Sequence, residues 1–586
     1  MSSNHDLPTR EKPHSKTQCE AWIIGSGTAA LASALYLVQL AGIAPQKVHI
    51  LDSHGSLGLA LHHQGDHCSG YDQFAGCLSV PVGEPLKELL ALVPSVRDEN
   101  RSVFDKIENN NAEVGRAKSG TSTEKEKGKG IGIGIGRRRR RRRRKKKKTK
   151  KENDRNDHTR FLVQRNGELR TIPTDSLNLN TRHRLSLMKL FFKDEASLQR
   201  KRISDCLPPS FFGSTFWAIW SAQFGFRPGH SASEFRRTIR QYIQDFHGHG
   251  LAMLSCLDTT GRYQFEGVFL PIYHFLRSLD VDYRFDAQVK DVGTAVRGRQ
   301  TVVDRIEYVE DGFELKQLVG GDDIVIVTLG STASGSTTGT NEDPPFRTFL
   351  RPSEALDESW ALWLKLEARH GGLGDPYNFC TRQRESMIER FTVTTEDLDI
   401  YARLCALSDS PVSAGSDAGL FIALQESPWG MSVCLPTQPV FSEQPPNVRV
   451  FWGYAKFPEN KGKFVPKAMV RCCGAEIMEE LLGHLHLNPQ HLVKRTVTVP
   501  TVMPRMGAIL LPRALGDRPE VIPPRIANLA LIGQFCELSQ HSCVDMSYSV
   551  RTAQRAVAHL TGLTAEEGRE FHWCRLSTLF RILFWR

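Results

Sequence analysis

A short apolar run and a glycine-rich turn begin the patterned part of the chain. Residues 21–24 read AWII, and the turn GSG follows. The stretch TAALASALYLVQLAG then has the composition of a helix that ends near Gly42. A second apolar run, VHIL, closes with Asp52. Apolar runs of this length predict buried strands, so the pattern predicts a strand–helix–strand unit.

The glycines of this turn suggest a ligand. Gly25, Gly27 and Ala30 occupy the three positions of a dinucleotide-binding turn. The first permits a tight turn, the second lets a pyrophosphate approach the backbone, and the third lets the helix pack closely. The first N–H groups of the helix then face the phosphates. Asp52 is placed to accept hydrogen bonds from a ribose, so we expect a dinucleotide; a structural unit without ligand is the alternative.

Two later segments repeat this pattern. DDIVIVTLGS predicts a buried strand that runs into Gly330 and Ser331. NLALIGQF predicts a strand that ends at Gly533, and the helical pattern SYSVRTAQRAVAHL follows it. We infer that the C-terminal part of the chain returns to complete the nucleotide-binding domain.

Between these segments the pattern changes several times. TRFLVQRNGELRTI alternates around an Asn-Gly pair and predicts a hairpin. Residues 183–246 have mostly helical patterning, and VDYRFDAQVKDV predicts further strands. Residues 108–157 are polar, charged and rich in glycine, so we expect no fold there.

The charge of the chain is dominated by one block. Residues 137–148 are eight arginines and four lysines, and Lys150 and Lys151 follow. These 14 positive charges exceed the net charge of +11, so the rest of the chain is slightly acidic. Proteins that track nucleic acid spread basic residues over a folded face with aromatics between them, and this block holds none. We expect no specific nucleic-acid partner.

Length and cysteine content narrow the class of protein further. A chain of 586 residues has room for two to four domains. The N-terminus is polar, and no apolar run reaches about 18 residues, so we expect neither a secretory signal nor a spanning helix. The 13 cysteines have no paired spacing, which favours reduced thiols and a cytoplasmic location.

Several segments together resemble the oleate hydratase family, also called myosin-cross-reactive antigens. They are IIGSGTAALASALYL, FFGSTFWAIWSAQFGFRPGHSASEFRR, RYQFEGVFLPI, DDIVIVTLGSTASGS, ESWALWLKLEARHGGLGDPYNFC, LPRALGDRPEVIPP and NLALIGQF. The resemblance implies an FAD-binding enzyme that adds water across the cis double bond of oleic and similar acids without net redox change. It also implies that the flavin organises the site rather than transferring hydride.

The same resemblance implies an α/β fold, in which a discontinuous Rossmann-like FAD-binding domain carries an inserted mixed α/β substrate-binding domain. The expected domains are FAD-binding parts at 20–101, 281–335 and 521–562, substrate parts at 158–280 and 336–520, a polybasic insertion at 108–157 and a tail at 563–586. The basic block lies where the family has a short connection, so we interpret it as an insertion without a role in the core activity.

Residues for the flavin follow from the turn and from the family's motifs. The expected contacts are Gly25, Ser26, Gly27, Thr28, Ala29, Ala30, Asp52, Gly55, Ser56, Gly76, Val289, Ser331, Gly533 and Phe535. No metal ligand is expected, because a solvated loop explains the histidines of HHQGDH (His62, His63 and His67) better than a metal site does.

Two catalytic positions are implied by the resemblance. Glu84 matches the family glutamate that activates water, and a carboxylate can take that proton as the cation forms. Its alternative role is to complement a helix dipole. Thr238 stands where the family has its proton-donating tyrosine. A phenol has a pKa of about 10 and an alcohol one roughly five units higher, so a threonine is weaker as a proton donor by about 7 kcal/mol.

The substrate contacts that the resemblance implies are only partly matched in this chain. Gln264 matches a family glutamine that holds the substrate, an unsaturated fatty acid. The family's polar carboxylate contacts align instead with Cys434, Pro436 and Val440, so the head group or the chain direction is open. An FAD-dependent isomerase and a catalytically impaired flavin- or lipid-binding relative are the alternatives. The tail RLSTLFRILFWR allows a peripheral contact with an anionic membrane, and a homodimer is also left open.

Overall fold

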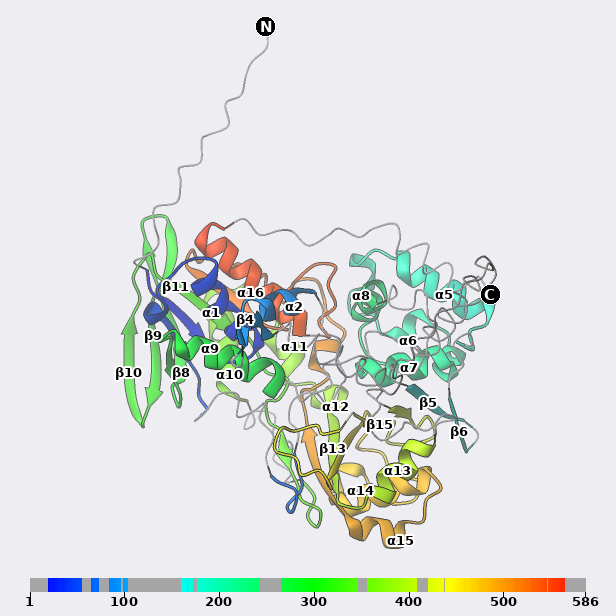
Figure 1. The fold of residues 1–586 in the computed structure, drawn as a ribbon. Coiled ribbons are helices and arrows are strands. Elements are labelled where there is room, and N and C mark those ends of the chain that lie inside the picture. The colour runs from blue at the N-terminus through cyan, green and yellow to red at the C-terminus, as the bar shows by residue number, and fades with distance from the viewer. Residues whose placement is uncertain are drawn as a thin grey trace, which may run out of the picture.

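The structure is a computed structural model that describes residues 19–54, 65–72, 84–95, 98–103, 160–165, 167–171, 177–242, 265–345, 356–407, 420–436, 438–544 and 546–563. Its centre is a five-stranded parallel sheet in the order β18-β11-β1-β2-β7 (Figure 1). The strands come from distant parts of the chain: β1 (Ala21–Ile24), β2 (Val48–Leu51), β7 (Asp282–Arg284), β11 (Ile324–Thr328) and β18 (Leu529–Ile532).

Helices explain why the central strands are apolar on both faces. Helices α1 (Thr28–Gln39) and α16 (Met546–Thr561) pack against each other and against strands of the sheet. Helix α2 (Glu84–Ala91) packs on α16, and α9 (Leu270–Ser278) packs on α1. Parallel sheets are normally covered in this way, which leaves no solvated face to call for polar residues. All four residues of β1, β2 and β18 are buried.

A second, antiparallel sheet lies beside the first. It is formed by β8 (Gln288–Arg297), β9 (Gln300–Glu310) and β10 (Phe313–Leu318), in the order β10-β9-β8. Helix α10 (Glu358–His370) packs on β8. Figure 1 shows β10 as the outermost strand at this side of the molecule.

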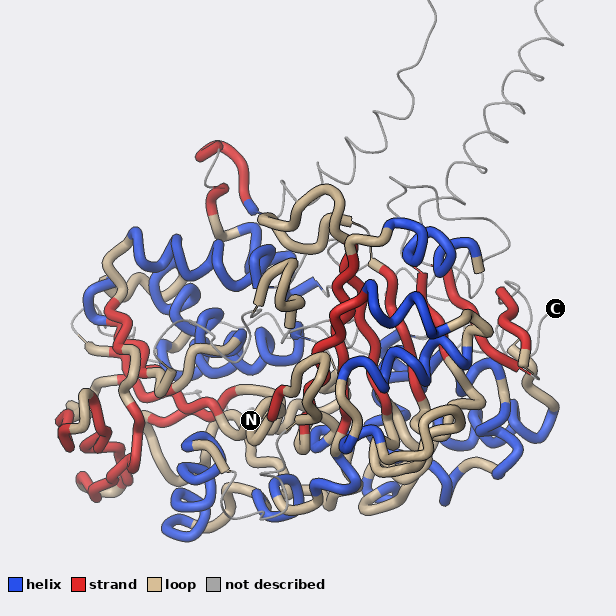
Figure 2. Tube along the Cα trace, turned by 90° about the horizontal axis from the view of Figure 1, so that it is seen from below, coloured by secondary structure: helices blue, strands red, loops and turns tan. Residues whose placement is uncertain are grey.

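The third region is an eight-stranded mixed sheet with its own core. Its order is β12-β17-β13-β16-β15-β14-β5-β6, and only β14 and β5 pair in parallel. The strands are β12 (Thr337–Thr338), β17 (Thr496–Met503), β13 (Ile388–Thr395), β16 (Arg449–Ala455), β15 (Met431–Leu435), β14 (Leu420–Ala423), β5 (Arg160–Arg165) and β6 (Glu168–Thr171). Helices α13 (Leu398–Ala406) and α14 (Gly474–His484) share its apolar cluster. Figure 2 shows the two large sheets side by side with helices between and around them.

Helices α5 (Thr181–Phe192), α6 (Ile203–Cys206), α7 (Thr215–Phe224) and α8 (Ala232–Tyr242) form a helical layer on this sheet. Helix α7 is buried on all sides because its sequence, TFWAIWSAQF, is apolar all round. Ser214 caps its first turn, and Gly225, with φ of 71°, ends it. The remaining short elements are β3 (Pro94–Ser95), β4 (Asp98–Ser102), α11 (Pro376–Cys380), α12 (Gln383–Ser386), α15 (Pro489–Leu492) and single turns at Pro45–Lys47, Ala196–Leu198, Pro209–Gly213, Phe265–Phe269, Met469–Arg471, Val493–Arg495 and Ala508–Leu510.

The predicted α/β class and the discontinuous parallel sheet are confirmed. The predicted strand–helix–strand unit is β1, α1 and β2, and the Asn-Gly hairpin is β5 and β6. Helix α1 ends at Gln39, three residues before Gly42, which has a φ of 70°. The basic block lies outside the described residues. Within them, no helix is both long and apolar enough to cross a membrane.

Candidate functional site

The carboxyl ends of three neighbouring parallel strands converge on Thr328, the last residue of β11. Gly25 follows β1 with a φ of 104°, and a Cβ there would lie 3.0 Å from the Thr328 Oγ1. Gly533 follows β18 with a φ of 105°, and a Cβ there would lie 3.4 Å from the Thr328 Cγ2. Both positions therefore require glycine. Ligands of open α/β sheets bind at this edge, outside the carboxyl ends of the strands.

Gly27, at the start of α1, has different surroundings. A Cβ at Gly27 would meet no protein atom within 4 Å among the described residues. Gly27 is the N-cap residue of α1 and supplies no side-chain cap to the N–H groups of the first turn. Ala29 and Ala30 are buried, so the helix packs closely on the sheet as the motif requires. An uncapped helix start with open space before it fits a pyrophosphate. We call residues 25–30 the dinucleotide turn.

The end of β2 supplies an acceptor beside this turn. Asp52 is buried, and its carboxylate accepts a hydrogen bond from the Ser26 hydroxyl. The other carboxylate oxygen lies 2.9 Å from the His54 Nδ1, and this hydrogen bond raises the pKa of His54. Near Gly25, the Thr328 Oγ1 is buried and has no hydrogen-bond partner within the part of the chain that the structure describes. The edge thus offers a carboxylate and an unpaired hydroxyl, which suits the polar groups of a nucleotide.

The other expected flavin residues have varied surroundings. The Ser331 carbonyl accepts a hydrogen bond from the Trp360 Nε1 at 3.1 Å. Phe535 is buried against Trp360, with ring centroids 4.7 Å apart, and it leaves no room for a Cβ at Gly330. Val289 is buried in β8. Phe535 and Val289 therefore have packing partners that already explain them, and a flavin contact remains a prediction. Gly55, Ser56, Gly76, Gln264 and the side chain of Glu84 lie outside the described residues; Glu84 is the first residue of α2.

Thr238 lies in the middle of α8 and is fully buried. Its hydroxyl donates a hydrogen bond to the Glu234 carbonyl at 2.8 Å, and its oxygen lies 2.8 Å from the Ser542 hydroxyl. The hydroxyl therefore has two protein partners, one on its own helix and one on the segment after β18. This geometry holds α8 against the parallel-sheet region.

Glu234, whose carbonyl accepts the hydrogen bond from Thr238, belongs to a buried ionic cluster that also contains Arg237, Arg513, Arg518 and Cys543. The Glu234 carboxylate lies 2.9 Å from the Arg513 Nη2 and 3.2 Å from the Arg518 Nη1, and the Cys543 thiol donates to it at 3.3 Å. Burial alone would raise the pKa of Glu234, but Arg518, Arg237 and Arg513 lower it to about 2. Arg237 also pairs with Glu537 at 2.6 Å. We call this the Glu234 cluster.

The sequence reasoning missed the Glu234 cluster. Its members are spread from α8 to residue 543, and no local spacing marks them as partners. The one feature of the sequence that could have pointed to this cluster is the presence of charged residues inside the segments that resemble the family. The aligned substrate positions Cys434 and Val440 are buried, in keeping with a low-polarity environment, and Tyr401 donates a hydrogen bond to the Pro436 carbonyl.

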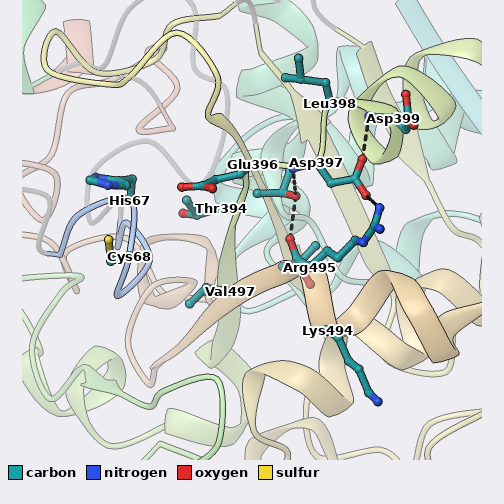
Figure 3. Close-up of a pocket in the computed structure, with 12 residues that line it drawn as sticks. His67, Cys68, Thr394, Glu396, Asp397, Leu398, Asp399, Lys494, Arg495 and Val497 are labelled. Atoms are coloured by element: carbon teal, nitrogen blue, oxygen red, sulfur yellow. Dashed lines mark hydrogen bonds and ion pairs between the residues drawn. The ribbon is translucent and has the colours of Figure 1, made fainter.

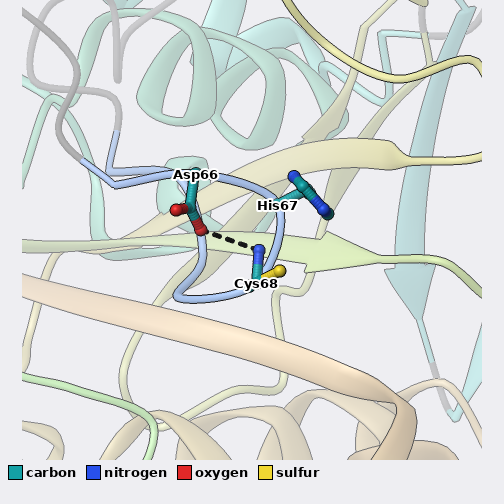
Figure 4. Close-up of side chains that lie close together, drawn as sticks. All are labelled: Asp66, His67 and Cys68. Atoms are coloured by element: carbon teal, nitrogen blue, oxygen red, sulfur yellow. Dashed lines mark hydrogen bonds between the residues drawn. The ribbon is translucent and has the colours of Figure 1, made fainter.

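His67 and its neighbours lie away from the dinucleotide turn. Figure 3 shows His67 and Cys68 on one wall of an open surface pocket of about 670 Å³, with Asp397 and Arg495 on the other. Ligand atoms of Asp66, His67 and Cys68 lie within 4.8 Å of one another (Figure 4). The Asp66 carboxylate, however, accepts hydrogen bonds from the backbone of Ser69 and Cys68, which lower its pKa. A carboxylate that closes its own turn explains this geometry without a metal.

The fold is of the α/β class, and residues 25–30 have the sequence and backbone features of a dinucleotide-binding turn. The chain belongs to the MCRA family, whose model matches residues 18–132 and 137–558. It is 28% identical to an oleate hydratase of Streptococcus pyogenes over 571 residues, covering 95% of this chain and 88% of that protein. It is 29% identical to a linoleate hydratase of Lactiplantibacillus plantarum over 420 residues, covering 67% of this chain and 72% of the relative. An oxidoreductase from Methanosarcina mazei superposes with a TM-score of 0.44 at 11% identity, covering 92% of this chain and 100% of that one.

Proposed function

We propose that this protein is an FAD-binding fatty acid hydratase, which adds water across the cis double bond of an unsaturated fatty acid to give a hydroxy fatty acid. The observation that carries the proposal is the dinucleotide turn in a member of the MCRA family. The turn has an uncapped helix start, open space at Gly27 and an adjacent buried carboxylate. The named relatives act on oleate and linoleate, both unsaturated fatty acids.

In this proposal, the chain's own residues hold the cofactor at the edge of the parallel sheet. The N–H groups of residues 27–30 bind the pyrophosphate, and Asp52 accepts hydrogen bonds from the ribose. Thr328 offers its unpaired hydroxyl beside Gly25. Bound FAD would organise the site for the substrate and would transfer no hydride.

The addition needs one proton donor and one base. A proton goes to one alkene carbon, and the oxygen of water bonds to the other carbon. The water then gives up a proton, so the net change is the addition of one water molecule. Glu84 would take this proton, because a carboxylate is a suitable base as positive charge develops on the carbon. Gln264 would help to hold the fatty acid.

A second candidate is a relative that binds flavin and lipid but hydrates poorly. The hydroxyl of Thr238 favours it, because that group is fully buried and bonded to the Glu234 carbonyl and the Ser542 hydroxyl. An alcohol held in this way is a weak acid and has no free path to a substrate. If hydration occurs, its proton donor is then a different group.

The test uses the purified full-length chain with FAD and oleate in water enriched in heavy oxygen. The proposal predicts a hydroxy acid that carries the heavy isotope. The Glu84→Gln variant should lose this product, because an amide cannot take a proton from water. A product with a shifted double bond would support an isomerase, and bound but unchanged oleate would support the impaired relative.

A further inference from the structure

The contact between α8 and the segment after β18 contains a phenol as well as the Thr238 alcohol. Thr238 and Tyr242 are four residues apart in α8, so they are neighbours on one face of the helix. The segment, residues 533–544, begins with Gly533 at the carboxyl edge of the parallel sheet and reaches Thr238 through the Ser542 hydroxyl. Tyr242 therefore lies one helical turn from the place where α8 meets the chain that leaves the cofactor edge.

Gln241 links the phenol of Tyr242 to this segment. The Gln241 Nε2 donates a hydrogen bond to the Tyr242 hydroxyl oxygen at 3.0 Å, and the Gln241 Oε1 accepts one from the Ser542 N–H at 2.9 Å. Because both ends of the amide are engaged, the orientation of its N–H toward the phenol is fixed. The Tyr242 ring stacks on Phe224 of α7, with centroids 5.2 Å apart, and only 5% of the side chain is exposed.

Three other acidic groups around this contact are poor proton donors at neutral pH. Glu234 is ionised, because its pKa is lowered to about 2. The Cys543 thiol donates its proton to the Glu234 carboxylate, and burial raises its pKa to about 12. The Tyr548 hydroxyl donates to the Cys536 carbonyl at 2.6 Å, and burial raises its pKa. The hydrogen bond from the neighbouring amide is instead one that the Tyr242 oxygen accepts, and such a bond stabilises the phenolate that a proton transfer leaves.

We propose that Tyr242 is the proton donor of the hydration, an inference that rests on the proposed function. The phenolic O–H bond breaks as the electron pair of the double bond forms a C–H bond at one alkene carbon. The oxygen of water bonds to the other carbon, and Glu84 takes a proton from that water. Glu84 then releases its proton to solvent and the Tyr242 phenolate regains one, so the net change is the addition of one water molecule.

In this scheme Gln241 is a positioning residue, which acts by stabilising the phenolate through its N–H. The acidity of the two hydroxyls on this face of α8 favours the same assignment. A phenol has an ordinary pKa of about 10, roughly five units below that of an alcohol. Tyr242 can therefore give up a proton to an alkene far more readily than Thr238, whose hydroxyl donates to a carbonyl of its own helix.

The first test measures the initial rate of hydroxy acid formation by the full-length chain with FAD and oleate in water enriched in heavy oxygen. Tyr242→Phe removes only the phenolic oxygen and should lower the rate at least about 100-fold, the usual contribution of a general acid. FAD affinity and the unfolding midpoint, measured on the same preparations, should stay near the native values. Tyr454→Phe is the matched control, since Tyr454 is also buried and its hydroxyl donates to the Ala222 carbonyl of α7. This control should keep the native rate.

Two outcomes of this test have different meanings. A native chain that forms no labelled hydroxy acid would contradict the proposed function, and the role of Tyr242 would fall with it. A native chain that hydrates oleate and a folded Tyr242→Phe variant with the same rate would overturn the role of Tyr242 alone.

A pH profile tests the chemistry without removing the phenol. Helix α7, which packs on the Tyr242 ring, has no titratable side chain in its sequence TFWAIWSAQF. The fall in rate at alkaline pH should therefore follow the loss of the phenolic proton. Gln241→Leu removes the N–H that stabilises the phenolate, so this fall should move to higher pH. A fluorotyrosine at position 242, whose phenol is more acidic, should move it to lower pH. An alkaline fall that neither change moves would overturn the proposal.

Discussion

The dinucleotide turn and the surroundings of Thr238 differ in whether their polar groups have hydrogen-bond partners. At the turn, no described protein atom lies within 4 Å of a Cβ at Gly27, and the Thr328 hydroxyl has no hydrogen-bond partner among the described residues. At Thr238, the hydroxyl has two partners and the side chain is fully buried. Open space with unpaired polar groups is what a binding site needs, whereas a closed hydrogen-bond network is what a structural contact needs. Substitutions at the dinucleotide turn should therefore change FAD binding, whereas substitutions around Thr238 should change the stability of the fold.

Loss of the Glu234 carboxylate should have the largest effect on stability. Glu234→Ala leaves Arg513 and Arg518 buried beside one another with fewer counter-charges. Removing one partner of a buried ion pair costs about 3–5 kcal/mol, because the other charge stays buried and unpaired. The free energy of unfolding in denaturant measures this loss. A variant as stable as the native chain would show that the cluster does not hold α8 in place.

Acid should weaken the same cluster. The pKa of Glu234 is lowered to about 2 in the folded chain, from an ordinary value near 4.5. The contribution of the Glu234 carboxylate to the free energy of unfolding is therefore fully present above about pH 4.5 and is lost progressively as the pH falls towards 2. The native chain should lose stability across this window more steeply than Glu234→Gln, which has no proton to gain there. Equal slopes of unfolding free energy against pH would count against the assignment.

Thr238→Val should have a smaller effect. Valine keeps the shape of the side chain but removes the hydrogen bonds to the Glu234 carbonyl and Ser542. We expect a loss of about 1–2 kcal/mol in unfolding free energy, since Ser542 loses a buried partner. Any hydration rate measured in the folded variant should match that of the native chain. A large loss of rate with intact stability would restore Thr238 as the proton donor.

The sequence predicts the parallel-sheet region well because its signals are local. The apolar runs of β1, β2, β11 and β18 are short and almost wholly buried, and β1, β11 and β18 each run into a turn that contains a glycine, so pattern alone identifies them. The Glu234 cluster joins residues about 300 positions apart, and no periodicity marks such pairs. The order of the eight-stranded sheet is equally non-local, since β5 pairs with β14 across about 260 residues.

Within the candidate site, the glycine positions were predictable from the sequence, but the hydrogen-bond partners of the polar groups were not. Gly25 and Gly533 have the positive φ that a tight turn requires. That the Thr238 hydroxyl is bonded to Ser542, and that Asp52 is bonded to Ser26, depends on how distant segments pack. The catalytic roles of Glu84 and Thr238 stay predictions, as do the contacts of Gln264, Gly55, Ser56 and Gly76.

The most direct measurement is a titration of FAD into the native chain and into Gly27→Val, followed by flavin fluorescence, with thermal unfolding of both proteins as the control for folding. A Cβ at position 27 would lie more than 4 Å from every protein atom that the structure describes, so the variant should fold normally. It would occupy the space that the pyrophosphate needs, so FAD affinity should fall at least about 100-fold, or about 2.7 kcal/mol. A native chain that binds FAD tightly and a folded variant that does not would confirm the site. Unchanged FAD affinity in the folded variant would contradict it.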